Sequence, residues 1–205
     1  MSTLRRAGMA LVTITLAGVL GYGCSGSSQL ATLPAERSAV VTRYVALGGD
    51  DNLGSRRTFA DAWPQRLFRR ALPRAAVFVN LADSRSGIVE ILADQVDAAI
   101  ALRPDIVTIT VVDDAERETA PSDVERDLTE VLDRVGAARP KARILVGTIP
   151  PGTGSPQVAN GLDQAIRRAA TGRAVVVDLG SIGDSDLDLR NAAIARAFAR
   201  ALRPA

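Results

Sequence analysis

Acidic residues stand at the ends of several apolar runs, where the chain would turn away from a sheet. Asp50 and Asp51 follow the first such run, and Asp113 and Asp114 end the third. Because the carboxyl ends of parallel strands meet at one edge of a sheet, we expect these carboxylates to lie close together. Further acidic residues that would join them are Asp83, Asp184, Asp186 and Asp188. The pattern predicts an acidic rim along one edge.

Two kinds of chemistry would suit an acidic rim. Clustered carboxylates raise one another's pKa or require a cation, and oxygen ligands suit Mg²⁺ or Ca²⁺. One hypothesis is therefore a divalent-cation site of Asp50, Asp51, Asp113 and Asp114. A sharper form is a hydrolase with Asp50 as nucleophile or metal ligand. The alternative is that these residues cap helices, solvate loops or are neutralised by arginines, in which case no cofactor is required.

The chain contains no histidine and a single cysteine, Cys24. The first absence excludes imidazole general bases, Ser-His and Cys-His dyads, and histidine metal ligands. The second excludes an intrachain disulfide and a thiolate metal cluster. Hydrolytic chemistry at the rim would therefore have to rest on its carboxyl groups.

The composition indicates one globular domain with an aliphatic core. Of 205 residues, 47% are apolar but only 3% are aromatic, so the core has to be built from Val, Ile, Leu and Ala. Arg5 and Arg6 are the only charged residues before Cys24, and without them basic and acidic residues are equal in number. A nucleic-acid-binding protein would show a basic excess, so we expect no nucleic-acid partner.

Residues 1–23 have the pattern of an export signal peptide. Two arginines precede the apolar run Ala7–Leu20, which is shorter than the roughly 20 residues that a membrane-spanning helix needs. Cys24 stands where the lipid of a bacterial lipoprotein is attached; an ordinary signal peptide with an incidental cysteine is the alternative. Residues 24–42 are rich in Ser and Ala and show no apolar periodicity, so we expect them to form a flexible tether. We expect an exported domain of residues 43–205, lipid-anchored to the outer face of the bacterial membrane or secreted.

Five apolar runs alternate with five segments of helical periodicity. The runs predict strands at residues 44–47, 75–81, 106–112, 143–149 and 174–179. The periodic segments predict helices at about residues 58–72, 87–102, 122–136, 156–170 and 190–202, with Thr58 and a capping box at Ser122 as starts. Besides the tether, only residues 115–121 are expected to be disordered.

Strict alternation of apolar strands and helices predicts a parallel sheet covered by helices on both faces. With five strands, we expect a three-layer α/β/α sandwich of flavodoxin-like order rather than a barrel, which needs eight.

Several phrases of the domain resemble blocks of the SGNH (GDSL) hydrolases, in the family's order. Residues 44–54, YVALGGDDNLG, resemble the first block, often YVALGDS, and residues 78–82, FVNLA, resemble the second. Residues 102–109, LRPDIVTI, resemble the approach to the third block, which the family completes as GGND. The resemblance covers residues 43–202. It implies the family's flavodoxin-like fold and an acyl-ester hydrolase with a serine nucleophile, a histidine base and an oxyanion hole.

The positions that carry the family's chemistry differ in this chain. The serine nucleophile falls on Asp50, or on Asp51 after a one-residue shift. The glycine of the second block falls on Arg85, or on Gly87 after a shift, and the oxyanion-binding Asn falls on Asp113. Because a carboxylate presents a like charge to an oxyanion, the resemblance predicts a defective oxyanion hole.

The last block of the family reads Asp-x-x-His. Its nearest match is Asp186-Leu187-Asp188-Leu189, so leucine replaces the base. Ser55, Ser84 and Ser86 are candidates for a relocated nucleophile, but turn or cap roles are the simpler interpretation, and a serine still needs a base.

We therefore interpret the chain as an SGNH-like lipoprotein that lacks the family's catalysis and binds an acyl or glycan ligand at the cell envelope. The alternative is a divergent carboxylate- or metal-dependent hydrolase that uses the acidic rim. A third interpretation is a flavodoxin-like binding domain unrelated to hydrolases. The chain has no Gly-rich phosphate loop, so nucleotide binding is not expected.

Overall fold

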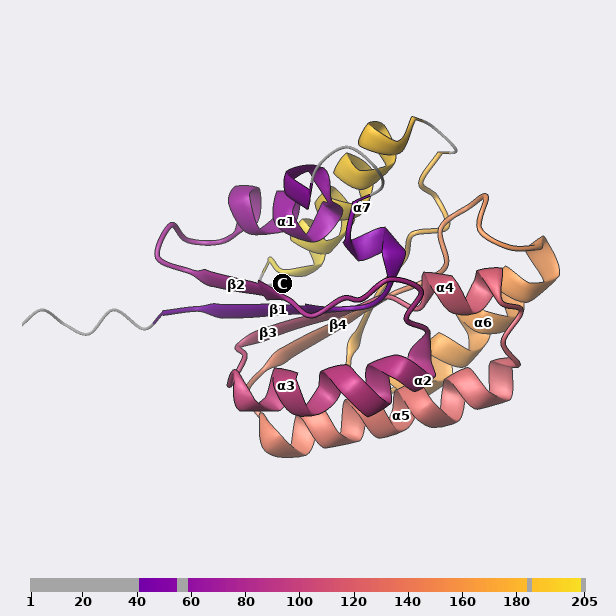
Figure 1. The fold of residues 1–205 in the computed structure, drawn as a ribbon, viewed down its shortest axis with the longest axis horizontal. Coiled ribbons are helices and arrows are strands. Elements are labelled where there is room, and N and C mark those ends of the chain that lie inside the picture. The colour runs from indigo at the N-terminus through magenta and orange to yellow at the C-terminus, as the bar shows by residue number, and fades with distance from the viewer. Residues whose placement is uncertain (1–40, 55–58, 184–185, 204–205) are drawn as a thin grey trace, which may run out of the picture. The chain divides into compact units, whose positions relative to one another are not determined.

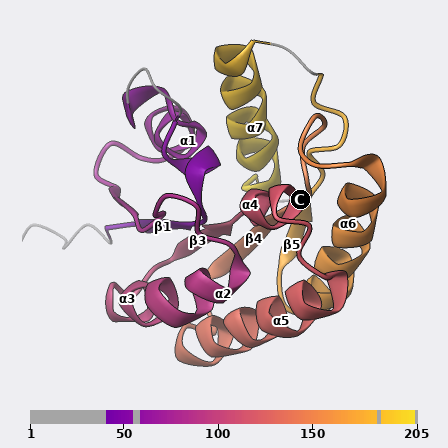
Figure 2. The same ribbon diagram turned by 45° about the vertical axis from the view of Figure 1, so that its right-hand side comes forward.

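Five strands form one parallel sheet in the computed structural model, which describes residues 41–54, 59–183 and 186–203. They lie in the order β2-β1-β3-β4-β5 (Figures 1 and 2). Their bounds are β1 (Arg43–Leu47), β2 (Val77–Asn80), β3 (Ile106–Ile109), β4 (Arg143–Gly147) and β5 (Val175–Val177). This doubly wound order is that of flavodoxin-like folds, so the predicted fold class is confirmed.

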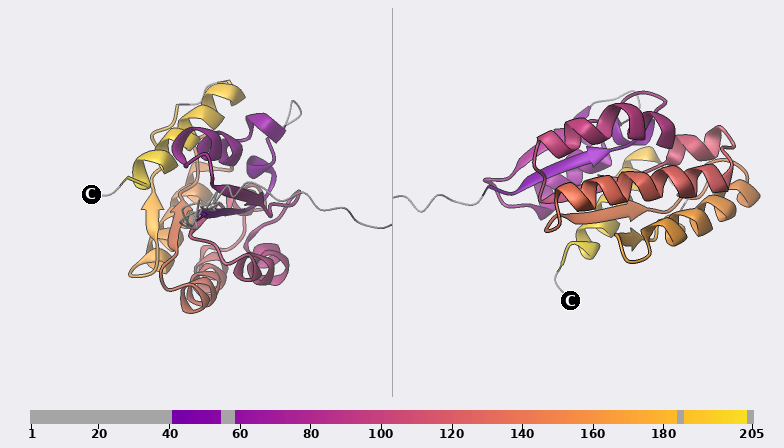
Figure 3. Two further views of the ribbon diagram at one scale, coloured as in Figure 1. Left: turned by 90° about the vertical axis from the view of Figure 1, so that its left-hand side faces the viewer. Right: turned by 90° about the horizontal axis from the view of Figure 1, so that it is seen from below.

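Helices cover both faces of the sheet (Figure 2). Their bounds are α1 (Trp63–Ala71), α2 (Ile88–Glu90), α3 (Val96–Ala101), α4 (Val112–Glu116), α5 (Pro121–Ala138), α6 (Pro156–Ala170) and α7 (Leu187–Ala201). Helices α1 and α7 pack on one face, and α2, α3, α5 and α6 pack on the other (Figure 3). Short 3₁₀ turns η1 (Asp50–Asn52) and η2 (Phe59–Asp61) precede α1, and a π-helical segment η3 (Ile91–Gln95) joins α2 to α3.

Alternate residues of β1 separate two core layers. Val45 and Leu47 face the layer under α5, whereas Tyr44 and Ala46 face the layer under α1 and α7. The first layer is entirely aliphatic, as the composition requires. Five aromatic residues, Tyr44, Trp63, Phe68, Phe78 and Phe198, lie in the second layer, where the rings of Trp63 and Phe198 stack with centroids 4.5 Å apart. This contact fixes α7 against α1 and hence positions the start of α7 beside the carboxyl edge of the sheet.

The strand predicted at residues 106–112 ends at Ile109, and the chain turns into helix α4 instead. The apolar pattern extends past the end of the strand because Val111 and Val112 are also buried, although they lie outside the sheet. The expectation that residues 115–121 are disordered is also wrong. Helix α4 extends to Glu116, and the N–H of Thr119 donates to the carbonyl of Asp114 at 2.9 Å. The carboxyl groups of Asp113 and Asp114 therefore lie on a helix, not at a strand tip.

The helix predicted at residues 87–102 is interrupted by η3, which places the buried Gln95 beside the turn that follows β1. Its Oε1 accepts from the N–H of Gly48 and its Nε2 donates to the Gly48 carbonyl, both at 3.0 Å. These paired hydrogen bonds fix the turn that carries Asp50 and Asp51.

Helix starts differ from the sequence prediction at two places. The capping box expected at Ser122 is absent, because α5 begins at Pro121 with Ala120 as an N-cap that makes no side-chain bond. Helix α7 begins at Leu187, three residues before the predicted start, because Asp186 caps it through its side chain. Thr58, the predicted start of the first helix, lies outside the described residues, as do the predicted signal peptide, Cys24 and most of the tether. No helix of the described part is long and apolar enough to cross a membrane.

Candidate functional site

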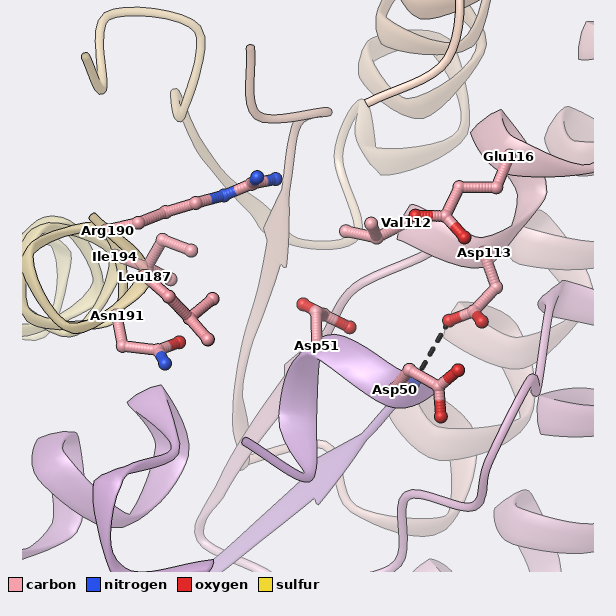
Figure 4. Close-up of a pocket in the computed structure, with 9 residues that line it drawn as sticks. All are labelled: Asp50, Asp51, Val112, Asp113, Glu116, Leu187, Arg190, Asn191 and Ile194. Atoms are coloured by element: carbon pink, nitrogen blue, oxygen red, sulfur yellow. Dashed lines mark hydrogen bonds between the residues drawn. The ribbon is translucent and has the colours of Figure 1, made fainter. Parts of the chain in front are cut away.

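A pocket of about 170 Å³ opens at the carboxyl edge of the sheet, between η1, helix α4 and the first turns of α7 (Figure 4). It is lined by Asp50, Asp51, Val112, Asp113, Glu116, Leu187, Arg190, Asn191 and Ile194. Four carboxyl groups and one guanidinium therefore share a small pocket with apolar side chains. The structure brings three of the four residues of the predicted cation site to this pocket and leaves out Asp114.

Asp113 lies directly against the backbone of Asp50. The N–H of Asp50 donates to Oδ2 of Asp113 at 3.1 Å, drawn as the dashed line in Figure 4. Burial raises the pKa of Asp113 to about 6; the Asp50 N–H opposes the rise and the Asp50 charge adds to it. The carboxyl of Asp113 thus takes the backbone donor of the position that the family resemblance gives to the nucleophile.

Asp51 lies within hydrogen-bonding distance of two side chains. Thr110 Oγ1 lies 3.2 Å from its Oδ1, and Trp63 Nε1 donates to its Oδ2 at 3.2 Å. Burial raises the pKa of Asp51 to about 7; these hydrogen bonds and the charge of Arg190 oppose the rise, and Asp113 adds to it. The Thr110 hydroxyl also lies 2.9 Å from Oδ1 of Asn52. Because that hydroxyl has one hydrogen, a protonated Asp51 can donate to Thr110 while Thr110 donates to Asn52. The surroundings therefore accommodate Asp51 with or without its proton.

Asp114 follows Asp113 but points to the start of α2. Its Oδ2 accepts from the N–H of Ile88 at 2.7 Å, and a Cβ placed on Gly87 would lie 2.8 Å from its Oδ1. The N–H of Gly87 donates to Oε2 of Glu90 at 2.8 Å. Asp114 is therefore a structural partner of α2, and the Gly87 N–H has a partner within its own helix.

Three of the carboxyl groups proposed as cation ligands line one pocket, but their oxygens accept hydrogen bonds from other groups. No group of three or more His, Cys, Asp or Glu side chains among the described residues is arranged to hold a metal ion. The oxygens of Asp51, Asp113 and Asp114 instead accept hydrogen bonds from three different directions. The geometry of the described residues therefore favours hydrogen bonding over coordination of Mg²⁺ or Ca²⁺.

The residues that match the family's last block, Asp186–Leu189, form the start of α7 in this chain. Asp186 accepts from the N–H of Asp188 at 2.8 Å as the N-cap of α7, and Asp188 pairs with Arg66 at 3.4 Å. Leu189, at the position of the family's base, is 60% exposed and does not line the pocket. Asp184 lies outside the described residues.

The two candidate serines that the structure describes, Ser84 and Ser86, do not line the pocket. The hydroxyl of Ser84 donates to Oδ1 of Asp50 at 2.8 Å, from the loop in which Asp83 accepts from the Ser84 N–H at 2.7 Å. Ser86 is buried, with its carbonyl against Gly49, and Ser55 lies outside the described residues. Arg85 stands in the same loop in the left-handed region, at a φ of 56°.

The sequence prediction missed the contribution of α7. Leu187, Arg190, Asn191 and Ile194 line the pocket at the i, i+3, i+4 and i+7 spacing of one helix face. A guanidinium nitrogen of Arg190 donates to Thr153 Oγ1 at 2.7 Å, so the loop after β4 holds the side chain at the pocket. The spacing was visible in the sequence, but the predicted helix began too late to contain its first member.

Comparison with known proteins gives a family match and several similar solved structures. The GDSL-like Lipase/Acylhydrolase family model matches residues 44–201. No curated protein matches the chain. Among solved structures, TesA is similar with a TM-score of 0.65 and 17% identity, over 80% of this chain and 99% of that one.

Two further solved structures share the fold at low identity. The psychrotrophic esterase EstA from Pseudoalteromonas sp. has a TM-score of 0.61 and 16% identity, over 77% of this chain and 94% of that one. The acetyl xylan esterase AlAXEase has a TM-score of 0.63 and 14% identity, over 78% of this chain and all 100% of that one. The family match spans the sheet, except for Arg43 at the start of β1, and every α-helix of the described residues. The chain therefore belongs to the GDSL-like lipase/acylhydrolase (SGNH) family.

Proposed function

We propose that this domain binds a small ligand in the pocket at the carboxyl edge of its sheet and does not carry out serine-dependent ester hydrolysis. The observation that carries the proposal is the hydrogen bond from the Asp50 N–H to Asp113. An oxyanion hole needs free donors where negative charge develops. Here the donor at the nucleophile position is taken by a carboxyl group of the protein.

The second donor that the resemblance implies is also taken, since the Gly87 N–H donates to Glu90. An oxyanion in this pocket would meet the charge of Asp113 instead of an amide donor. Loss of one such donor lowers the rate of acyl transfer by roughly 10² to 10³. The chain also has no histidine to activate a serine. Together these features support binding without serine-based turnover.

The lining of the pocket suggests which class of ligand it accepts. Carboxylates, Asn191 and Arg190 form hydrogen bonds with hydroxyl groups, and Leu187 and Ile194 offer apolar contact to a sugar face or a short acyl chain. One protein of similar structure is by name an acetyl xylan esterase. We infer that an acylated glycan of the cell envelope is the ligand.

We also propose a location for the domain, which rests on the export-signal pattern of residues 1–23 and on the position of Cys24. A lipid on Cys24 and export by residues 1–23 would place the domain at the outer face of the cell membrane, near such glycans. Mass spectrometry of the protein from membrane fractions tests this directly. We expect a diacylglycerol-modified Cys24, and an unmodified, secreted protein would overturn the lipid anchor while leaving the ligand proposal intact.

Two measurements on the purified full chain test the ligand proposal. Hydrolysis of p-nitrophenyl acetate and butyrate, with and without Mg²⁺ and Ca²⁺, should not exceed the buffer rate. Acetylated xylo-oligosaccharides should bind in calorimetry and lose at least tenfold in affinity in Arg190→Gln. The matched control Arg167→Gln lies on α6 away from the pocket and should bind like the wild type. Turnover that disappears in Asp50→Ala would overturn the non-catalytic assignment.

A second candidate function is a carboxylate-dependent hydrolase. It is favoured by one observation: Asp51 and Asp113, with pKa values raised to about 7 and about 6, line the same pocket. Carboxyl groups that titrate near neutral pH can act as general acid and base. This function predicts a bell-shaped pH dependence of turnover between these two values, lost in either Asp51→Asn or Asp113→Asn. Equal rates in both variants and the wild type would exclude it.

A further inference from the structure

Two segments in the layer formed by α1 and α7 contain basic residues but no acidic residue. Residues 63–82 contain four arginines and no acidic residue, and residues 189–203 contain another four and none. Arg70, Arg196, Arg200 and Arg203 are exposed, and none of them forms an ion pair with a carboxylate of the described residues. The chain is nearly neutral overall, so this distribution creates one positively charged face.

Three of these arginines, Arg70, Arg196 and Arg203, line two adjoining depressions between α1 and α7, which share Arg70 and Ala199. The first is lined by Arg66, Leu67, Arg70, Ala192, Ala195, Arg196 and Ala199, and the second by Arg70, Ala71, Ala199, Leu202 and Arg203. Arg200 follows Arg196 by one turn of α7, on the same side of the helix. We call Arg70, Arg196, Arg200 and Arg203 the arginine groove; its floor is made of small and apolar residues.

In the other helical layer, arginines form ion pairs with nearby carboxylates. On that side Arg126 pairs with Asp123 and Asp127, Arg168 pairs with Glu125 at 2.8 Å, and Arg173 pairs with Asp133 at 2.7 Å. Arginine is therefore neutralised in α5 and α6 but left uncompensated in the arginine groove. An exposed face of one sign attracts a surface of the opposite sign.

The arginine groove lies at the edge of the sheet where the chain enters the domain. The N–H of Val77, six residues after α1 ends, donates to the carbonyl of Thr42 at 2.9 Å. The guanidinium of Arg143, at the start of β4, donates to the carbonyl of Leu202 at 2.9 Å, so the end of α7 lies at that edge too. Only 18 residues separate Cys24 from Arg43. They reach at most about 65 Å even when fully extended.

We propose that the arginine groove docks the domain onto the anionic headgroups of a lipid bilayer. The choice of a bilayer as the occupant rests on the proposed envelope location, because a lipid on Cys24 would keep the groove within reach of the membrane. The arginines supply charge complementarity and the apolar floor accommodates the glycerol and first acyl carbons. Since the pocket at Asp50 lies at the opposite edge of the sheet, docking in this way leaves that pocket open to the side away from the membrane.

Vesicle sedimentation with the purified full chain carrying Cys24→Ala tests the groove without the lipid anchor. Vesicles of phosphatidylcholine alone are compared with vesicles that also contain phosphatidylglycerol. Each arginine at an anionic surface strengthens binding by roughly fivefold. We expect the preference for phosphatidylglycerol to fall by roughly 100-fold in Arg70→Gln/Arg196→Gln/Arg203→Gln. The control Arg134→Gln/Arg168→Gln/Arg173→Gln removes the same charge from α5, from the end of α6 and from the segment after α6, and should keep the preference for phosphatidylglycerol.

The outcomes separate the two proposals. An equal loss of the preference for phosphatidylglycerol in both triple variants would show an effect of net charge alone and would overturn the proposal. An unchanged preference in the groove variant, with its circular dichroism intact, would overturn it as well. Stronger retention on duplex DNA than on anionic vesicles would identify a nucleic-acid surface instead. Absence of lipid on Cys24 in cells would remove the anchor but would not alter the vesicle result.

Discussion

The backbone N–H of Asp50 and the carboxyl of Asp113 lie 3.1 Å apart and form a hydrogen bond at the centre of the candidate site. In the family resemblance, these positions belong to the nucleophile and to an amide that binds the oxyanion. In this chain the protein's own carboxyl group meets the donor, so an acceptor stands where the family presents a donor. The proposed loss of serine-based hydrolysis rests on this hydrogen bond.

Replacing Asp113 by asparagine should stabilise the protein above neutral pH. A pKa raised from 3.8 to about 6 means that ionisation costs the folded state on the order of 3 kcal/mol. The favourable contribution of the protonated form is complete below the unfolded pKa and is lost as the pH rises through about 6. Because asparagine can still accept from the Asp50 N–H, we expect a gain of about 1–2 kcal/mol at pH 8. Urea unfolding at pH 8 and pH 4 measures it, and an equal gain at both pH values would contradict this origin.

Asp51→Asn should change stability over a window that reaches higher pH. Its carboxyl has a pKa raised to about 7, so the wild type loses stability as the pH rises between about 4 and 7. Asparagine imitates the protonated acid: its oxygen can accept from Trp63 Nε1 and its amide can donate to Thr110. We expect a higher Tm than the wild type at pH 8 and nearly the same Tm at pH 4. A lower Tm at pH 8 would mean that the carboxylate form is the one the fold requires.

Gly49→Ala should be strongly destabilising. A Cβ at Gly49 would lie 1.9 Å from Oδ2 of Asp113 and 2.7 Å from the backbone carbonyl of Ser86, and the backbone cannot move as a side chain would. Overpacking of this kind costs about 1–3 kcal/mol. Gly136→Ala on α5 is the control, since nothing lies within 4 Å of its Cβ and alanine should stabilise the helix by about 1 kcal/mol. Thermal unfolding of the two variants should therefore shift in opposite directions.

Addition of Mg²⁺ or Ca²⁺ should leave the protein unchanged. The carboxyl oxygens of Asp51, Asp113 and Asp114 accept hydrogen bonds from separate donors, and a cation would have to compete with them. We expect no heat in calorimetric titration and no shift in Tm with either cation. A rise in Tm with Ca²⁺ that disappears in Asp113→Asn would support the cation site predicted from the acidic rim instead.

The amino-acid sequence by itself determined the architecture of the domain. Apolar runs such as Tyr44–Leu47 have to be covered on both faces, and the alternation with amphipathic segments leaves a parallel sheet between two helical layers as the simple solution. It also determined one chemical fact, the absence of histidine, which no folding can change. Local pattern sufficed here because burial and composition act on each segment separately.

The tertiary structure decided which of two neighbouring acids belongs to the site. Asp113 and Asp114 read alike in the sequence, but both lie in the first turn of α4, where successive side chains point about 100° apart. One therefore faces the pocket and the N–H of Asp50, and the other faces the N–H of Ile88. Arg190 likewise joins the site because the stacking of Trp63 on Phe198 holds α7 against α1 and because the Arg190 guanidinium donates to Thr153 in the loop after β4. Such assignments depend on helix phase and on contacts between distant segments, which no local pattern contains.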